Sequence, residues 1–263
     1  MIDEIHQSMI SMFLRCGLQF EKRYLENLKI PPGVAARRGS SFHKAAEVNH
    51  KQKMETKADL PLGDLKDAGR DEFVRLVKEE GVFIPTDKLT DKNALLNEAL
   101  NESLSAIELY HRDIAPGIEP AAVEKALVAN IGCALPIGGK LDLIEPTRIR
   151  DFKCGKTKNQ TWADRAIQPT FYHALYKSEY GAYPEEFRYD IISPLKTKTN
   201  HIALPTHRDD TDIVNVRLTI NEFIKALKAG DFHQADPDHW ICSEDWCGFW
   251  WICSRGALKR TIH

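Results

Sequence analysis

The chain has 263 residues, of which 43% are hydrophobic, and its formal net charge at pH 7 is -2. This length and apolar content suffice to bury a sizeable core, and they lie near the upper end for a single domain. We therefore expect one domain that spans residues 1–263. The nearly balanced charge excludes a globally basic coat for nucleic acid, so any such contact has to use local patches of Lys and Arg.

The sequence gives no sign of a targeting or membrane segment. The first thirty residues lack a basic start followed by an apolar run, and no stretch approaches eighteen uncharged apolar residues. Neither secretion nor membrane insertion is expected on this pattern. We expect the protein to work in the cytoplasm.

The first half of the chain has the periodicity of helices. These helices are expected at about residues 5–28, 39–56, 64–80 and 91–114, with breaks marked by proline and glycine. Residues 1–115 should form a mainly helical part that packs as a layer on the rest.

From Ala121 the pattern changes to that of strands, which continue through Lys153. The later elements expected are a helix at about 162–180, strands at about 186–192 and 201–205, and a last helix at about 219–229. Residues 116–235 should thus be an α/β core, with a mixed central sheet flanked by helices. Residues 236–263 form a tail rich in Cys and Trp.

A predicted hairpin carries the main chemical signal. Its strands are residues 137–144 and 148–152, joined by a turn at Glu145-Pro146-Thr147. In-register pairing would put Asp142 across from Asp151, with Lys153 on the same face as Asp151. Two close carboxylates repel unless a cation lies between them, and a hard divalent ion is the usual solution. The pattern is typical of a metal-dependent phosphodiesterase, although isolated acids and lysines at strand ends are more often simply solvated.

Together with further segments, this hairpin resembles the PD-(D/E)XK nucleases, and within them the RecB-like branch that includes AddB, CRISPR-adaptation exonucleases and phage recombination exonucleases. The resembling segments, in order, are Ser11 to Cys16 with Phe20 to Tyr24, Gly39 to His43, Gly139 to Asp142, Asp151 to Lys153, Gln168 to Tyr172, and Cys242 with Cys247 and Cys253. Each segment alone is weak, and their shared order carries the resemblance. It implies a restriction-endonuclease-like core.

The resemblance also implies a set of metal ligands. Asp142, Asp151, His43 and the main-chain carbonyl of Phe152 would hold one or two Mg²⁺ or Mn²⁺ ions, and an imidazole beside carboxylates suits Mn²⁺ at least as well as Mg²⁺. Lys153 would assist the water that attacks phosphorus. A histidine on a helix surface is the plain alternative for His43.

Three further side chains are candidates for the active site. Gln168 and Tyr172 share a helix face at i, i+4 spacing, and the resemblance places both over the active site. Pro169 lies between them, so the helix either begins near Ile167 or kinks there. Glu124 is on the strand before the hairpin, where some relatives carry an acid near the metals. The alternatives are core packing for Tyr172 and a solvated surface for Glu124.

A second constellation consists of cysteines. Cys242, Cys247 and Cys253 are grouped in the tail, and Cys16 lies near the other end of the sequence. Together these four would bind a 4Fe-4S cluster, as the resemblance implies, or a structural Zn²⁺. The C-x4-C-x5-C spacing departs from the C-x2-C-x5-C common in the RecB-like branch. Buried free thiols packed among tryptophans are the alternative.

Contacts to substrate would come from local cations and aromatic rings. The cations, all close to the motifs, are Arg37, Arg38, Lys156, Lys158, Lys196 and Lys198. The rings of Phe13, Phe20 and Tyr24 would stack bases of a single strand, unless they belong to the core.

We therefore expect a metal-dependent DNA exonuclease that acts on single strands or resected ends in repair or recombination, with a phage as one source. The rival readings are a module that only binds DNA, and an endonuclease or nuclease subunit that is active only with a partner. A helicase, a recombinase or a single-strand-binding protein would be such a partner. The chain has no P-loop motif, so a motor would be a separate protein.

Overall fold

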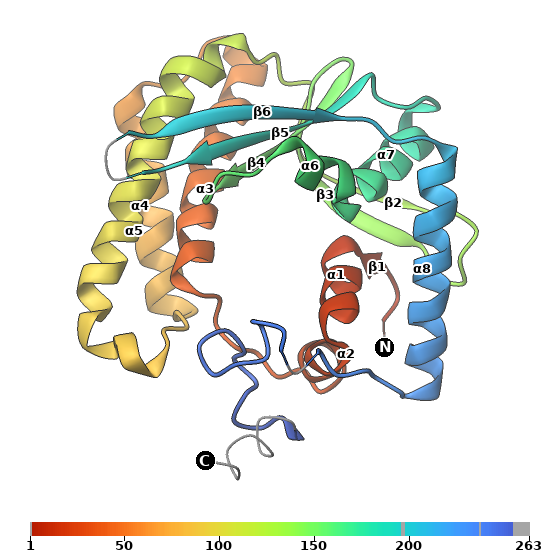
Figure 1. The fold of residues 1–263 in the computed structure, drawn as a ribbon. Helices are drawn as coiled ribbons and strands as arrows, with labels where there is room; N and C mark the ends of the chain where they lie inside the picture. Colours follow the sequence, from red (N-terminus) through yellow and green to blue (C-terminus); the bar gives the residue numbers. More distant parts are fainter. Residues whose placement is uncertain (1, 196–197, 237, 255–263) are drawn as a thin grey trace.

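Six β-strands form one mixed sheet, and helices cover both of its faces (Figure 1). The structure is a computed structural model that describes residues 2–195, 198–236 and 238–254. Of the cations named above, Lys196 lies outside the described residues. The expected α/β class, with a mixed central sheet flanked by helices, is confirmed.

The strands follow the order β1-β3-β4-β5-β6, and β2 also pairs with β3. Their bounds are β1 Ile5–His6, β2 Ala122–Ala129, β3 Ile137–Ile144, β4 Arg148–Cys154, β5 Glu186–Ser193 and β6 Asn200–Thr206. The pairs β2·β3, β3·β4 and β5·β6 are antiparallel, whereas β1·β3 and β4·β5 are parallel. The parallel β4·β5 pair requires a crossover, which the chain makes through two helices.

One edge of β3 is shared between two partners. Its carboxyl end pairs with β4, where Leu143 lies opposite Arg150, and its amino end pairs with β1, where Ile137 lies opposite Ile5. The strands β3 and β4 therefore diverge beyond Leu143. This divergence opens the sheet at the residues that carry the acidic motif.

One face of the sheet is covered by the long helices on the left of Figure 1. The helical segments of this layer are α3 Val34–Thr56, α4 Leu62–Glu79, the 3-10 turn η2 Thr86–Asp91, α5 Lys92–Leu109, the π-turn η3 Tyr110–Ile114 and the 3-10 turn η4 Ala115–Gly117. Phe42 of α3 and Tyr110 are fully buried against Phe152 of β4. Phe152 thus points into this layer, as strand alternation predicts.

The other face is covered by the remaining helices. These are α1 Gln7–Arg15, α2 Gly17–Phe20, the π-turn η1 Glu21–Leu25, α6 Gln160–Arg165, α7 Ile167–Tyr180 and α8 Asp210–Ala229. Phe13, Phe20 and Phe223 pack edge to face in this core. After α8 the chain returns past α2 as turns, and the described part of the tail contains no long helix or strand (Figure 1).

The expected first helix at 5–28 is wrong, because a strand and three short helical segments replace it. The chain leaves helical geometry at Cys16, whose φ is -165° and ψ is 106°. The last helix begins at Asp210 rather than near residue 219. Asp209 caps it, since its side chain accepts from the main-chain N–H groups of Thr211 and Asp212.

Among the described residues, no helix combines the length and the apolar character that crossing a membrane would require.

Candidate active site

Asp142 lies where the pairing of β3 with β4 ends. Its carboxylate oxygen Oδ2 accepts a hydrogen bond of 3.3 Å from the main-chain N–H of Phe152. In a strand, the N–H and C=O of one residue point to the same edge, so the carbonyl of Phe152 faces this opening as well. The Asp142 carboxylate therefore occupies the gap between the strands, beside Asp151.

Asp151 is the buried centre of the site. Its side chain is 1% exposed, Lys153 Nζ lies 2.5 Å from Oδ2, and the amide of Gln168 donates a hydrogen bond of 2.6 Å to Oδ1. The hydroxyl of Tyr189 donates a hydrogen bond of 3.3 Å to Oε1 of the Gln168 side chain. Both oxygens of the carboxylate are thus held by neighbours on β4 and α7, which fixes its orientation.

Tyr172 contacts the backbone of β3 rather than a carboxylate. Its hydroxyl donates to the carbonyl of Lys140 at 2.8 Å, and its side chain is largely buried. A Cβ at Gly139 would lie 2.9 Å from Leu175 and 3.2 Å from the Tyr172 ring. Gly139 therefore allows α7 to lie directly on β3, which brings Gln168 to Asp151. Helix α7 begins at Ile167, so Pro169 lies in its first turn, where proline is tolerated.

His43 and Glu124 lie on the other side of Asp142. His43 Nδ1 is 3.3 Å from Oδ2 of Asp142, and Glu124 forms an ion pair with Lys140. These residues line an open cleft of about 430 Å³ between α3, α4, β2 and β3. The cleft exposes Asp142 to solvent on the side away from Gln168, which gives a route to the carboxylates.

The backbone of β2 is strained opposite Asp142. Val123 pairs with Leu143 and Lys125 with Leu141, so Glu124 lies between them, across from Asp142. Its φ is 52°, a left-handed conformation that residues other than glycine rarely adopt. Such strain persists only where the surroundings impose it, and it gathers at functional sites.

The electrostatics of the site are those of crowded carboxylates around one amine. Burial, and next the negative charge of Asp151, raise the pKa of Asp142 to about 6. Burial would lower the pKa of Lys153, but the carboxylates of Asp151 and Asp142 outweigh it, so this pKa is raised. Lys153 therefore stays protonated at neutral pH and can donate to a water or a phosphate oxygen.

The donor chemistry fits a hard divalent ion. Asp142 and Asp151 supply carboxylate oxygens, Phe152 supplies a carbonyl and His43 an imidazole, which are the ligands that Mg²⁺ and Mn²⁺ accept. Oδ2 of Asp151 is buried and has no hydrogen bond of normal geometry, although Lys153 lies beside it. Within the described ranges, however, no group of three or more His, Cys, Asp or Glu side chains is close enough to form a complete metal site.

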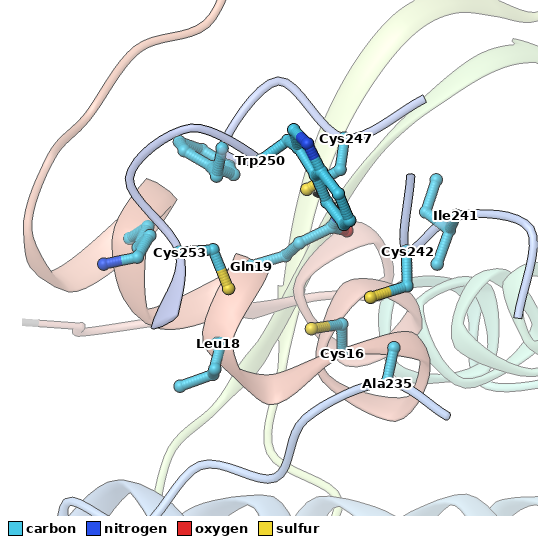
Figure 2. A pocket seen from close by; sticks show the side chains of 11 residues that line it. Cys16, Leu18, Gln19, Ala235, Ile241, Cys242, Cys247, Trp250 and Cys253 are labelled. Carbon is cyan, nitrogen blue, oxygen red and sulfur yellow. Dashed lines mark hydrogen bonds between the residues drawn. The ribbon is translucent and has the colours of Figure 1, made fainter. Parts of the chain in front are cut away.

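The four cysteines of the second constellation line one small cavity (Figure 2). Cys16 immediately precedes α2, whereas Cys242, Cys247 and Cys253 come from the tail, and the thiols of Cys16 and Cys242 point to the same side (Figure 2). The amide of Gln19 donates to Cys247 Sγ at 3.3 Å.

The cavity is apolar and largely closed. Burial raises the pKa of the Cys247 thiol, and the ring of Trp250 covers part of the space (Figure 2). Its volume is about 20 Å³, roughly the room for one water molecule. The four thiols are thus gathered from both ends of the described chain, but any inorganic group would have to spread them apart.

Several expected substrate contacts are wrong. Arg37 is 2% exposed and hydrogen-bonds the carbonyl of Gly81, so it holds α3 to the end of α4. Phe13 and Phe20 are core residues, and Tyr24 stacks on Phe20. Phe13 and Phe20 therefore offer no platform for bases, whereas Tyr24 is only half-buried.

Three of the expected cations remain near the site: Arg38, Lys156 and Lys158. Arg38 forms an ion pair with Glu102, and the ammonium of Lys158 lies over the Trp162 ring. Lys198 adjoins β6, and Lys156 is exposed in the loop after β4. None of these contacts excludes a role toward phosphate.

Tyr189 is the site residue that the sequence did not reveal. It lies on β5 opposite Asp151, its ring is 5.6 Å from Lys153 Nζ, and its hydroxyl holds Gln168. Only the parallel β4·β5 pairing brings it here, and that pairing has no local signal in the sequence.

Comparisons with known proteins agree with this geometry. The model of the PD-(D/E)XK nuclease superfamily matches residues 5–254. One similar solved structure is described as a putative exonuclease from Eubacterium rectale, with a TM-score of 0.59 and 11% identity, over 91% of this chain and 87% of that chain. Another, described as SSO0001, has a TM-score of 0.37 and 14% identity, over 95% of this chain and 96% of that chain. A search of curated proteins gave no match. The expected restriction-endonuclease-like core is confirmed at the level of the fold.

Proposed function

This chain belongs to the PD-(D/E)XK nuclease superfamily, and on that premise we propose that it is a metal-dependent DNA exonuclease of the RecB-like type. As a member of that superfamily it is a nuclease, a hydrolase of phosphodiester bonds. The observation that carries the proposal is the contact of Asp151 with both Lys153 and Gln168, next to Asp142 in the gap between β3 and β4.

In this proposal the acidic residues hold the metal and the others orient the reactants. Asp142, Asp151 and the Phe152 carbonyl would bind Mg²⁺ or Mn²⁺, with His43 and Glu124 on the side of the open cleft. The ion would supply positive charge at the scissile phosphate and acidify a water molecule. Lys153, which is protonated, donates a hydrogen bond to the attacking water or to a phosphate oxygen. Gln168 and Tyr172 keep α7 and the carboxylate in place.

The preference for DNA ends is part of this proposal, because the fold neighbour described as a putative exonuclease is 11% identical and shows the fold alone. We place the activity on single-stranded or resected ends, in repair or recombination. A helicase, a recombinase or a single-strand-binding protein would supply such ends.

We also propose that Cys16, Cys242, Cys247 and Cys253 bind a 4Fe-4S cluster, with a structural Zn²⁺ as the alternative. Support comes from the convergence of all four thiols on one cavity, from segments more than two hundred positions apart in the sequence. Such a cluster would tie α2 to the tail, and its contribution would be architectural.

The first experiment incubates anaerobically purified protein with linear and with circular single-stranded DNA in the presence of Mn²⁺. Wild type should degrade the linear DNA alone, and Lys153→Ala should lose at least about a hundredfold in rate. Lys225→Ala, which removes an exposed lysine of α8 that pairs with Glu222, is the matched control and should retain activity.

Each other result points elsewhere. Cleavage of the circle would indicate an endonuclease. Tight DNA binding without cleavage of either substrate would favour a binding module, or a subunit that needs a partner. Full activity in Lys153→Ala would refute the assigned role of the lysine.

A further inference from the structure

We propose that a groove between α1, the α6–α7 junction and the returning chain binds an unpaired nucleotide of the single strand, with its base stacked on Trp240 and its phosphates near Arg15 and Arg165. This inference rests on the proposed function and names a surface that would hold the strand outside the catalytic cleft.

The groove is large enough for a nucleotide. Its volume is about 620 Å³, within the range of about 300–1,000 Å³ typical of ligand pockets. The lining residues that matter here are Leu14, Arg15, Arg165, His233, His239 and Trp240. They come from three segments far apart in the sequence, so the groove exists only in the folded chain.

Trp240 supplies an exposed aromatic surface. Its side chain is 57% exposed, its ring stands edge to face with Trp246 at 5.2 Å, and Trp246 is 58% exposed. The two neighbouring rings form an exposed aromatic patch, and exposed apolar patches mark interaction sites. A base has an apolar face of similar size, and stacking on it tolerates any sequence.

The charges in the groove suit a phosphate backbone. Arg15 and Arg165 are exposed, and neither guanidinium forms an ion pair with a carboxylate in the part of the chain that the structure describes. The carboxylate lining the groove is Asp236, which already accepts a hydrogen bond of 2.9 Å from the N–H of Asp238. The groove is therefore a local basic patch on a chain whose net charge is -2.

One wall of the groove is formed by the segment that also supplies Gln168 to the catalytic site. Arg165 ends α6 and Ile167 begins α7, and both line the groove. The next residue, Gln168, donates to Asp151 at 2.6 Å. A strand lying on Arg165 would thus contact the chain three positions before Gln168, whose side chain orients the catalytic acid.

The wall that carries Trp240 is anchored to the N-terminal helices. The N–H of Leu18 donates to the carbonyl of His233 at 3.2 Å, and the Phe13 ring stands edge to face with the His233 ring at 5.0 Å. Gly17 lets the chain approach this closely, because a Cβ there would lie 2.9 Å from the main-chain nitrogen of His233. One backbone hydrogen bond and one ring contact therefore hold His233, at the side of the groove, against the N-terminal helices.

The test is fluorescence anisotropy of a labelled oligo-dT with the full chain and no added divalent metal, so that binding is separated from cleavage. Trp240→Ala should weaken binding at least about fivefold, and Trp240→Phe should restore most of it. Trp251→Ala is the matched control, since Trp251 is also 57% exposed but lies outside the groove, and it should bind as wild type does. When log Kd is plotted against the logarithm of the salt concentration, Arg15→Ala and Arg165→Ala should each reduce the slope by about 0.7, the value for one lost phosphate contact.

A second readout separates this inference from the nuclease activity. With Mn²⁺, Trp240→Ala should raise KM for single-stranded DNA while kcat at saturating DNA stays within about twofold of wild type. If Trp240→Ala binds oligo-dT as tightly as wild type and cleaves DNA normally with Mn²⁺, the groove does not bind the strand. The proposed nuclease function would then still stand. Equal weakening in Trp251→Ala, or a wild-type chain that binds no oligo-dT, would overturn the groove proposal too.

Discussion

The amide of Gln168 donates to Oδ1 of Asp151 at 2.6 Å while the ammonium of Lys153 lies 2.5 Å from Oδ2 of the same carboxylate. Helix α7 and strand β4 therefore fix one acid from two directions. The hydroxyl of Tyr189 holds the amide of Gln168 in turn. Which way the carboxylate faces is thus decided by residues that need not touch the substrate.

We predict that Gln168→Ala lowers kcat about 10- to 100-fold, the usual effect of removing a group that orients a metal-binding side chain. The measurement is steady-state cleavage of linear DNA with Mn²⁺. Gln160→Ala is the control, because Gln160 hydrogen-bonds Asp164 on the preceding helix and does not reach Asp151. An unchanged kcat in Gln168→Ala would show that Lys153 alone is enough to orient the acid.

Two glycines should respond oppositely to alanine. Gly17→Ala forces a Cβ against the backbone of His233, so it should lower the free energy of unfolding by about 1–3 kcal/mol. A Cβ at Gly39 meets nothing within 4 Å in the middle of α3, so Gly39→Ala should stabilise by about 0.5–1 kcal/mol. Urea titrations of the two variants test this pair, and a loss of stability in Gly39→Ala would contradict it.

Stability should fall in mild acid because of His50. Burial lowers the pKa of His50 to about 3, and its Nε2 lies 2.7 Å from the hydroxyl of Tyr110. The unfolded chain takes up this proton near pH 6.5, long before the folded chain does. The free energy of unfolding should therefore decrease from about pH 6.5 toward pH 3, by at most about 1.4 kcal/mol per pH unit from this group.

The measurement is the free energy of unfolding at pH 7 and at pH 5, for wild type, His50→Gln and His6→Gln. The difference in stability between the two pH values should shrink in His50→Gln and persist in His6→Gln, because His6 is a surface residue paired with Glu4. An unchanged difference in His50→Gln would assign the acid sensitivity to other groups, such as His173, whose pKa burial lowers to about 4.

The cysteine proposal predicts a specific pattern of metal content. Cys16→Ser and Cys247→Ser should lose bound iron and its visible absorption after anaerobic purification, whereas Cys133→Ser, whose thiol lies outside the cavity, should keep both. Metal analysis of the three variants decides. Bound zinc in place of iron would select the alternative metal, and the absence of both metals in wild type would indicate packed free thiols.

The sequence predicted the hairpin and its acidic face because strand alternation and turn residues are local signals. It did not predict β1, since a two-residue strand pairs only because β4 leaves that edge of β3 free. The early start of α8 did have a local signal, the Asp209 and Asp212 capping box.

The sequence predicted side-chain roles wrongly, or missed them, where they depend on packing between segments far apart in the chain. Arg37 was expected to contact DNA, but the end of α4 buries it against Gly81. Tyr189 was missed because its place beside Asp151 depends on the crossover between β4 and β5. Trp240 belongs to the same class, because its groove is assembled from three separate segments.

The position of the groove wall has a consequence for biosynthesis. All of the proposed catalytic residues lie between His43 and Tyr172, whereas the groove residues His233, His239 and Trp240 follow α8. Tyr189, which holds Gln168, follows on β5, so a nascent chain would contain the whole proposed catalytic site about forty residues before His233. A fragment that stops after α8 would therefore contain every proposed catalytic residue but lack the groove residues that follow α8.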